Sequence, residues 1–267
     1  MASDAGEILK PPVRPLAERG LDVLVWGGIA VLLIFAFHAV DMDKIVLLIT
    51  KSGNLREFSK DLVRPDFARW QLYVAQMWLT VQIGLWGTFL AVILAIPLGL
   101  LCARNITPVW IQQPVRRIND LLRSIPDIVL GILFITAVGL GPLPGVLALA
   151  VNTGSVLAKL FSEAVEAIDP RPVEGVRATG ASRLQEIAWG VIPQVGPLWT
   201  SYALYRFESN ARSATVLGLI GAGGIGQTLY DSLNGFNFRE TSAIVIVIVA
   251  AVTLIDLLSQ AMRTRLL

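Results

Sequence analysis

The chain is poor in reactive side chains. Its 267 residues include one cysteine, Cys102, and one histidine, His38. A single cysteine provides neither a disulfide framework nor paired thiols for a metal. Cys102 lies in an apolar run, which favours a buried packing role, and His38 lies near the end of an apolar segment, which favours packing or an interfacial position. The sequence therefore predicts no metal site, and we assign no catalytic residue.

Charge is also scarce. Charged residues make up 16% of the chain and hydrophobic residues 54%, with a mean hydropathy of +0.65, whereas soluble domains carry roughly 25% charged residues. A soluble core of this size cannot bury so much apolar surface, so we expect a bilayer as the solvent. The net charge of +2 is too small to indicate a nucleic-acid partner. The phosphate-binding pattern G-x-x-x-x-G-K-[ST] does not occur, so the chain is not expected to hydrolyse ATP by that route or to carry a cofactor.

Six apolar stretches predict an all-α, multi-pass membrane protein with a single domain over residues 1–267, because about 20 apolar residues cross a bilayer as a helix. Arg104–Arg123 is predicted to be a basic connector. Ser124, Pro126 and Asp127 then predict a helix start, with a capping hydroxyl, a first-turn proline and a first-turn acid. The predicted spans are Val23–Val40, Trp70–Ala103, Ile128–Leu140, Val146–Leu160, Pro197–Ile220 and Thr241–Leu258.

The Lys and Arg residues between these stretches favour a cytoplasmic N-terminus and C-terminus, because positive charge accumulates on the cytoplasmic side of membrane proteins. With that orientation, residues 41–69 form an outer segment. They are polar and charged and lead into Phe67, Trp70 and Tyr73. Aromatic residues concentrate at membrane interfaces, so we expect 41–69 to be interfacial.

A polar segment, residues 169–193, lies between the fourth and fifth predicted spans. It contains "EGVRATGASRLQEIAWGVIP", Glu174–Pro193, which predicts two short helices that break at Gly180, with Ser182 and Gln185 as a capping box. Pro193 is expected to end the second helix. That helix carries an apolar face at helical spacing, formed by Leu184, Ile187, Ala188 and Val191. The pattern suits a docking element for a soluble partner, and it also suits an ordinary amphipathic connector.

The same segment resembles the EAA loop of ABC-importer permeases, in which a glutamate is followed by a glycine after six residues and a proline after thirteen more. Glu174, Gly180 and Pro193 match these positions, and Ala181 follows the glycine as it often does in that family. The chain departs from the E-A-A pattern at Gly175 and Val176. From about Arg69 onward the chain also looks like the phosphonate-type permeases, which include phosphite importers. The segments that carry this likeness are "QPVRRINDLLRSIPDIVLGILFITAVGLGPLPGVLAL", "EAVEAIDPRPVEGVRATGA" and "YRFESNARSATVLGLIGAGGIG".

The resemblance implies a type I ABC-importer fold in the bacterial inner membrane. It also implies a homodimer, two cytoplasmic ATPase subunits that bind ATP and Mg, and an outer substrate-binding protein that delivers phosphonate-type or phosphite-type anions. In this family the EAA loop is the helix that couples the membrane subunit to the ATPase. The residues to which this role would pass are Glu174, Arg177, Gly180, Ala181 and Pro193.

The fifth predicted span carries polar residues near mid-depth: Arg206, Glu208, Asn210 and Arg212. Ionisable groups at that depth are costly and usually face a cavity or each other. Glu208 and Arg212 are four residues apart, so they can neutralise one another. Arg206 has no acid on its helical face, and its planar fork suits an oxyanion. We treat all four residues as a candidate substrate path, with inter-helix or inter-subunit salt bridges as the alternative.

The stretch "GLIGAGGIGQT" matches the dinucleotide fingerprint G-x-G-x-x-G at Gly221, Gly223 and Gly226, and Glu240 lies about twenty residues on. That fingerprint requires a strand before it and a helix after it. Here it is expected to follow a membrane helix and to precede a polar outer loop, "DSLNGFNFRET". We therefore expect these glycines, with Gly224, to form an outer gate where backbones pack closely, and anion binding by their N–H groups is a weaker possibility.

Three other functions fit parts of the sequence. A permease for methionine or another small solute would share the EAA loop and the glycine-rich stretch. A secondary transporter or channel would differ in having no ATP dependence, and such proteins often show internal repeats, which we do not find. A membrane oxidoreductase would rest on the glycine fingerprint alone.

Overall fold

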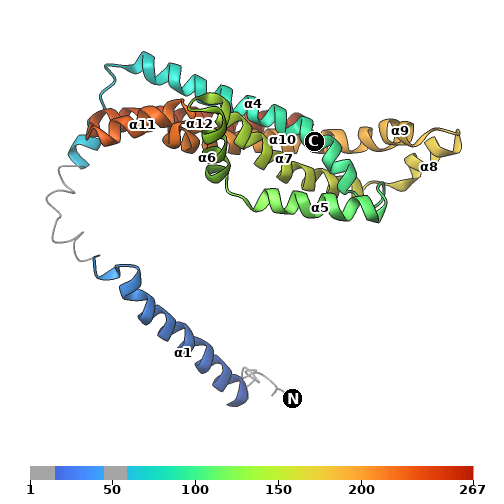
Figure 1. The fold of residues 1–267 in the computed structure, drawn as a ribbon, viewed down its shortest axis with the longest axis horizontal. Helices are drawn as coiled ribbons and strands as arrows, with labels where there is room; N and C mark the ends of the chain where they lie inside the picture. Colours follow the sequence, from blue (N-terminus) through green and yellow to red (C-terminus); the bar gives the residue numbers. More distant parts are fainter. Residues whose placement is uncertain (1–15, 45–58, 267) are drawn as a thin grey trace, which may run out of the picture. The chain divides into compact units, whose positions relative to one another are not determined.

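The computed structural model describes residues 16–44 and 59–266, which are helices and turns with no strand in either range (Figure 1). This confirms the all-α prediction. The chain divides into two units, residues 1–60 and 61–267. In the first unit α1, Leu16–Ala39, is followed by a short 3-10 helix, Met42–Lys44. Much of the predicted interfacial segment 41–69 lies outside the described residues.

The side chains of α1 that the structure describes are exposed and mostly apolar. Val23 and Phe35 expose 73% and 80% of their surface. A helix that is apolar on all sides is typical of a hydrocarbon environment. Helix α1 as a whole has 24 residues and extends about 36 Å.

The second unit is a helical bundle with a projecting loop (Figure 1). The helices α4, α7, α10 and α12 run along one long axis, and α8 and α9 extend beyond one end of the bundle. The elements are α4 (Trp70–Cys102), α5 (Val109–Ser124), α6 (Asp127–Val138), α7 (Pro142–Glu166), α8 (Pro170–Ala178), α9 (Arg183–Glu186), the π-helix η2 (Ile187–Val191), α10 (Ile192–Leu217), the π-helical turn η3 (Gly218–Ala222), α11 (Ile225–Asn234) and α12 (Phe238–Leu266).

Helix α7 is the centre of the bundle. In its most apolar 18 residues 61% are buried, against 33% in α4 and 22% in α12. Small residues let α4 approach it closely. A Cβ at Gly87 would lie 2.7 Å from the Cβ of Leu149, and a Cβ at Gly99 would lie 2.7 Å from that of Phe161. Close backbone approach replaces the hydrophobic effect as the main source of helix association inside a bilayer.

By length and composition α4, α7 and α12 are each able to cross a membrane. Their outer faces stay apolar: Trp78, Trp86 and Phe89 of α4 and Val249 and Leu257 of α12 are exposed. Such a surface is unstable in water and suits lipid. Several apolar helices therefore fit a multi-pass membrane protein.

The region of the third predicted span differs from the prediction. Residues 109–124 form the helix α5 where a connector was expected, and α5 meets α6 at a bend of 90°. Ser124 does not cap α6, because it ends α5 and its hydroxyl donates to the carbonyl of Leu121 at 2.7 Å. Pro126 occupies the N-cap position instead. The 12 residues of α6 extend only about 18 Å, well short of a hydrocarbon core.

The predicted polar loop after the fifth span is also wrong in part, because residues 225–234 form α11. Two apolar side chains one turn apart explain the helix. Ile225 is fully buried in a cluster with Tyr73, Met77 and Ile244, and Leu229 packs against the same cluster. Burial of this i,i+4 pair outweighs the polar character of the neighbouring residues.

The segment just before α4 is held against the start of α12. The backbone N–H of Asp66 donates to the carbonyl of Arg239 at 3.0 Å, and the Arg239 Nε donates to the carbonyl of Arg64 at 3.1 Å. The Ser242 hydroxyl donates to the carbonyl of Leu62. The described end of the predicted segment 41–69 therefore lies at the same end of the bundle as α11.

Candidate functional site

The loop 169–193 has the predicted break between two short helices. Asp169 caps α8 and accepts the N–H of Arg171 at 3.0 Å. Gly180 adopts a φ of +79°, a left-handed conformation that favours glycine. Ser182 then starts α9, and its backbone N–H donates to Oε1 of Gln185 at 2.8 Å. This is the Gln185 half of the predicted capping box.

Pro193 does not end the second helix, contrary to the prediction. It lies in the first turn of α10, which begins at Ile192. The proline ring would normally clash with the carbonyl four residues before it, at Trp189. That carbonyl belongs to the π-helix Ile187–Val191, whose wider turn accommodates the ring. The helical path therefore continues from the loop into the bundle.

The π-helix also divides the predicted apolar face. Val191 is 2% exposed, whereas Leu184 and Trp189 are 80% and 74% exposed. Trp189 lines a hollow of about 700 Å³ in the loop. The other residues that line it are Pro172, Gly175, Val176, Thr179, Gly180, Ala181 and Gln185. Large exposed apolar side chains beside a hollow are typical of a surface that binds another protein.

Two side chains fix the shape of this loop. Arg177 pairs with Glu186 across the break, with Nε to Oε1 and Nη2 to Oε2 both at 3.0 Å. Gln194, which no sequence pattern indicated, closes the base of the loop. Its Oε1 accepts the N–H of Asp169 at 3.2 Å, and its Nε2 donates to the carbonyl of Gly190 at 2.6 Å. Glu174 is exposed and lies outside these contacts.

The charges of α10 divide into two groups. Glu208 and Arg212 form the predicted pair at 3.2 Å, and both have further partners on α12. Arg263 donates to the second Glu208 oxygen at 3.3 Å, and Arg212 reaches Asp256 at 3.2 Å. These four side chains alternate in sign and join α10 to α12, so their charges are compensated inside the chain.

Arg206 and Asn210 belong to the second group. No carboxylate of the described residues lies within 4.0 Å of the Arg206 guanidinium, whose Nη2 is 3.4 Å from the Thr153 hydroxyl. Its buried Nε has no hydrogen-bond partner in the described part of the chain. Asn210 is 1% exposed and bonds Thr153 and Thr88. Among the described residues, Arg206 is therefore the charged member of the predicted path that has no carboxylate partner, and it keeps a buried donor without a partner.

The glycines follow α10 in a tight turn. Gly221, Gly223 and Gly224 have φ values of +103°, +76° and +75°. A Cβ at Gly224 would overlap the Thr80 hydroxyl, and one at Gly226 would overlap the carbonyl oxygen of Thr215. The turn follows a helix, and α11 follows it, so the βαβ surroundings of a dinucleotide site do not occur here.

Near the same end of the bundle lies a polar pocket of about 390 Å³. Its lining includes Glu240, which is 9% exposed and binds Arg69 and the Tyr73 hydroxyl. The hydrogen bond from Arg69 explains why a carboxylate is tolerated at this low exposure, and it holds the pKa of Arg69 above its ordinary value. Glu240 therefore has a structural partner and not the ribose-binding role that the fingerprint spacing would give it.

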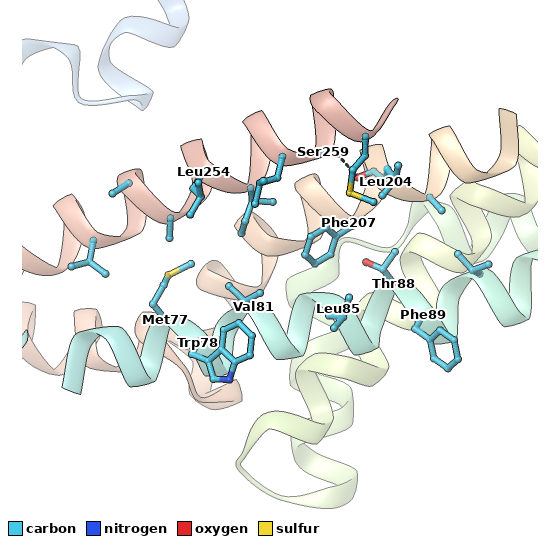
Figure 2. A pocket seen from close by; sticks show the side chains of 18 of the residues that line it. Met77, Trp78, Val81, Leu85, Thr88, Phe89, Leu204, Phe207, Leu254 and Ser259 are labelled. Atoms are coloured by element: carbon cyan, nitrogen blue, oxygen red, sulfur yellow. Dashed lines mark hydrogen bonds between the residues drawn. The ribbon is translucent and has the colours of Figure 1, made fainter. Parts of the chain in front are cut away.

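A larger groove of about 990 Å³ lies between α4, α10 and α12 (Figure 2). Val81 and Leu85 of α4, Phe207 of α10 and Leu254 of α12 line it. Arg206, Glu208 and Arg212 are not among its lining residues. The groove suits hydrocarbon and not an oxyanion. No group of three potential metal ligands occurs within the residues that the structure describes.

Comparison with known proteins adds a family and a fold. Residues 95–266 match the family model of the binding-protein-dependent transport system inner membrane component. The phosphite transport system permease protein PtxC of Stutzerimonas stutzeri is 37% identical over 247 residues, which are 92% of this chain and 88% of the relative. The putative cryptic phosphonate transport system permease protein PhnE2 of Escherichia coli is 61% identical over 117 residues, 44% of this chain and 96% of the relative.

Among solved structures, a chain of the inward-facing MetNI methionine ABC transporter is similar in fold. The TM-score is 0.67 over 76% of this chain and 99% of the other, at 22% sequence identity. At that identity the similarity concerns the fold alone.

Proposed function

The chain belongs to the family of binding-protein-dependent transport system inner membrane components, and from that premise we propose that it forms the membrane path of an ATP-driven importer for phosphite-type or phosphonate-type oxyanions. The observation that carries the substrate class is the 37% identity to a phosphite permease across 92% of the chain. The guanidinium of Arg206, which has no carboxylate within 4.0 Å among the described residues, supports it, because the planar fork of arginine matches two oxygens of such an anion.

The assembly that we propose contains two copies of this chain, each with six spans and with both termini in the cytoplasm. Two ATPase subunits bind ATP and Mg on the cytoplasmic side, and a substrate-binding protein delivers the anion from outside. We place the segment 41–69 on the outer side; its described residues 61–69 lie near the start of α12. The connection between Arg64 and Arg239 supports this placement, because it holds both segments at one end of the bundle.

The loop 169–193 is the proposed contact with the ATPase. Glu174 lies exposed on α8, and Gly180 and Ala181 form the turn that follows this helix. Leu184 and Trp189 supply exposed apolar surface in the same loop. Arg177 acts inside the loop through Glu186, and Pro193 carries the helical path into α10. The substitution Glu174→Lys should therefore reduce the amount of ATPase that copurifies with the membrane subunit, because it reverses a charge on the exposed surface.

In the proposed substrate path Arg206 is the anion contact. Asn210 is connected to Arg206 through the Thr153 hydroxyl. Glu208 and Arg212 hold α10 against α12. The turn with Gly221, Gly223, Gly224 and Gly226 is the proposed outer gate. Its close contacts with Thr80 and Leu140 support this role, because a tightly packed turn at the end of the path resists leakage.

The test is uptake into proteoliposomes that contain the complete complex and its binding protein. We expect uptake of phosphite or a small phosphonate to require ATP inside and to exceed uptake of phosphate, hypophosphite and methionine. Uptake of methionine in place of the oxyanions would refute the substrate class. Uptake at the same rate with and without ATP inside would refute the ATP-driven mechanism itself.

A further inference from the structure

A chain of buried hydrogen bonds connects Arg206 to two neighbouring helices. The Thr153 hydroxyl of α7 lies 3.4 Å from the Arg206 Nη2 and donates to the Asn210 Oδ1 at 2.7 Å. The Asn210 Nδ2 donates to the Thr88 hydroxyl of α4 at 2.8 Å. The Thr88 hydroxyl donates in turn to the carbonyl of Gly84 at 2.7 Å. The chain therefore joins α10, α7 and α4.

The direction of every bond in this chain is determined. A threonine hydroxyl has a single hydrogen to donate. Thr88 uses its hydrogen on the Gly84 carbonyl, so it accepts from Asn210. Thr153 uses its hydrogen on the Asn210 oxygen, so it presents only lone pairs to Arg206. The hydrogen-bond chain thus ends at Thr153 in an acceptor, which is what the donors of a guanidinium need.

The side chains that form this hydrogen-bond chain are buried. Asn210 and Thr153 are each 1% exposed and Thr88 is 6% exposed. Next to Asn210, α4 and α10 are in close contact, since a Cβ at Gly84 would lie 3.2 Å from the Cα of Ala211. Thr88 lines the groove between the helices (Figure 2), but its oxygen is already bonded to α4 and α10. Both polar atoms of Asn210 already have partners on α4 and α7, and the side chain is 1% exposed, so it is not presented to a substrate.

We propose that Thr153 is a positioning residue, which sets the orientation of the Arg206 guanidinium toward the translocated oxyanion, and that Asn210 and Thr88 hold Thr153 in place. The proposal rests on the function proposed above for Arg206. It removes Asn210 from the residues that would touch substrate, and it adds Thr153 as a residue that acts through Arg206 and that no sequence pattern indicated. An arginine without such a fixed acceptor would lose the defined geometry on which bidentate recognition depends.

The test uses the complete complex with ATPase and loaded binding protein. Thr153→Val keeps the shape of the side chain and removes the hydroxyl. We expect maximal phosphite uptake to fall by roughly tenfold, the scale of one hydrogen bond to a charged group. The concentration of loaded binding protein at half-maximal rate and the basal ATPase rate should stay unchanged. The melting temperature should fall by roughly a few degrees, because the buried Asn210 Oδ1 loses its donor. Thr153→Ser should restore most of the uptake.

The same measurement in an Arg206→Ala background separates the proposal from the function on which it rests. If Thr153 acts through Arg206, Thr153→Val causes no further loss once Arg206 is gone. An equal loss in both backgrounds, or a fall in basal ATPase together with uptake, would show a merely structural role and overturn the proposal. If Thr153→Val does not assemble, Thr153→Ala takes its place, with the same expectations.

Two further outcomes are distinguishable. If Arg206→Ala lowers uptake and Thr153→Val does not, the positioning role fails while the anion contact stands. If Arg206→Ala and Arg206→Lys both leave uptake and substrate-stimulated ATPase unchanged, the anion contact fails, and the role of Thr153 fails with it.

Discussion

Arg177 and Glu186 form a two-bond ion pair across the break between α8 and α9, with both N–O distances at 3.0 Å. The residues are nine positions apart, so the pair holds the two short helices at one angle. Glu186 lies mostly inside the loop, whereas Arg177 is largely exposed and covers it. The shape of the surface presented to a partner therefore depends on this contact.

Arg177→Ala should release that angle and weaken the binding of the ATPase by on the order of threefold, the scale of one exposed ion pair. The measurement is the ratio of ATPase to membrane subunit in complexes purified through a tag on the membrane subunit. Arg117→Ala is the matched control, because Arg117 is an exposed arginine for which no ion pair occurs within the described residues. Equal ratios for the two variants would contradict the prediction.

The same pair predicts a pH dependence. Hydrogen bonds from Arg177 hold the pKa of the Glu186 carboxyl below its ordinary value. A group whose pKa is lower in the folded state contributes stability that is complete above its unfolded pKa and is lost as the pH falls through the folded value. Retention of the ATPase should thus be constant near neutral pH and should fall only in acid. Glu186→Gln should abolish this acid-dependent part, whereas a pH profile identical to that of the unchanged protein would contradict the assignment.

The glycine turn predicts a contrast between two small substitutions. Gly226→Ala should destabilise the subunit by roughly 1–3 kcal/mol or more, because the added methyl group overlaps the carbonyl oxygen of Thr215. Gly196→Ala is the control: Gly196 lies in α10 with open space around it and no positive φ, so alanine should be neutral or stabilising there. Thermal unfolding of the purified subunit in detergent measures both, and a Gly226→Ala protein as stable as Gly196→Ala would contradict the close fit.

The ion network between α10 and α12 depends most on Glu208. Glu208→Gln leaves Arg263 without its carboxylate and Arg212 with Asp256 alone, and we expect a loss of about 1–3 kcal/mol in stability. Glu163→Gln removes the partner of Lys159 from an exposed pair at 3.8 Å and should cost below about 0.5 kcal/mol. The comparison uses the melting temperature of each complex, and similar losses in the two variants would show that the network is not stabilising.

The predicted and observed structures agree where one local signal decides. Long apolar runs located α4 to within one residue and found the middle parts of the longer helices α7 and α12, and Gly180 with Ser182 located the break in the loop. The signal failed where distant contacts decide. Helix α11 forms because Ile225 packs against Tyr73 and Ile244. Pro193 stays within a helix for a local reason: a π-helical turn precedes it. In the candidate site, the i,i+4 spacing predicted the pair of Glu208 and Arg212, whereas the Thr153 and Asp256 contacts join positions more than 40 residues apart.

The loop 169–193 also touches the turn between α4 and α5. Arg183 of α9 donates to the carbonyl of Ile106 in that turn. Glu166 at the end of α7 binds the same turn, accepting the Arg104 N–H at 3.0 Å and the Arg116 Nη2 of α5 at 3.2 Å. A displacement of α9 is thus transmitted to α4, α5 and α7 through the backbone of one turn.

Removing the Arg183 contact should therefore separate ATP hydrolysis from transport. In Arg183→Ala we expect the ATPase to stay bound and active, because the exposed surface around Glu174 and Trp189 is unchanged, while the anion transported per ATP falls severalfold, in keeping with the loss of one hydrogen bond to a charged group. Arg171→Ala is the control, since Arg171 lies in the same loop but pairs with its neighbour Asp169. Parallel assays of phosphate release and anion uptake in proteoliposomes give the ratio. An Arg183→Ala complex with the same ratio as Arg171→Ala would show that motion reaches the bundle through α10 and not through this turn.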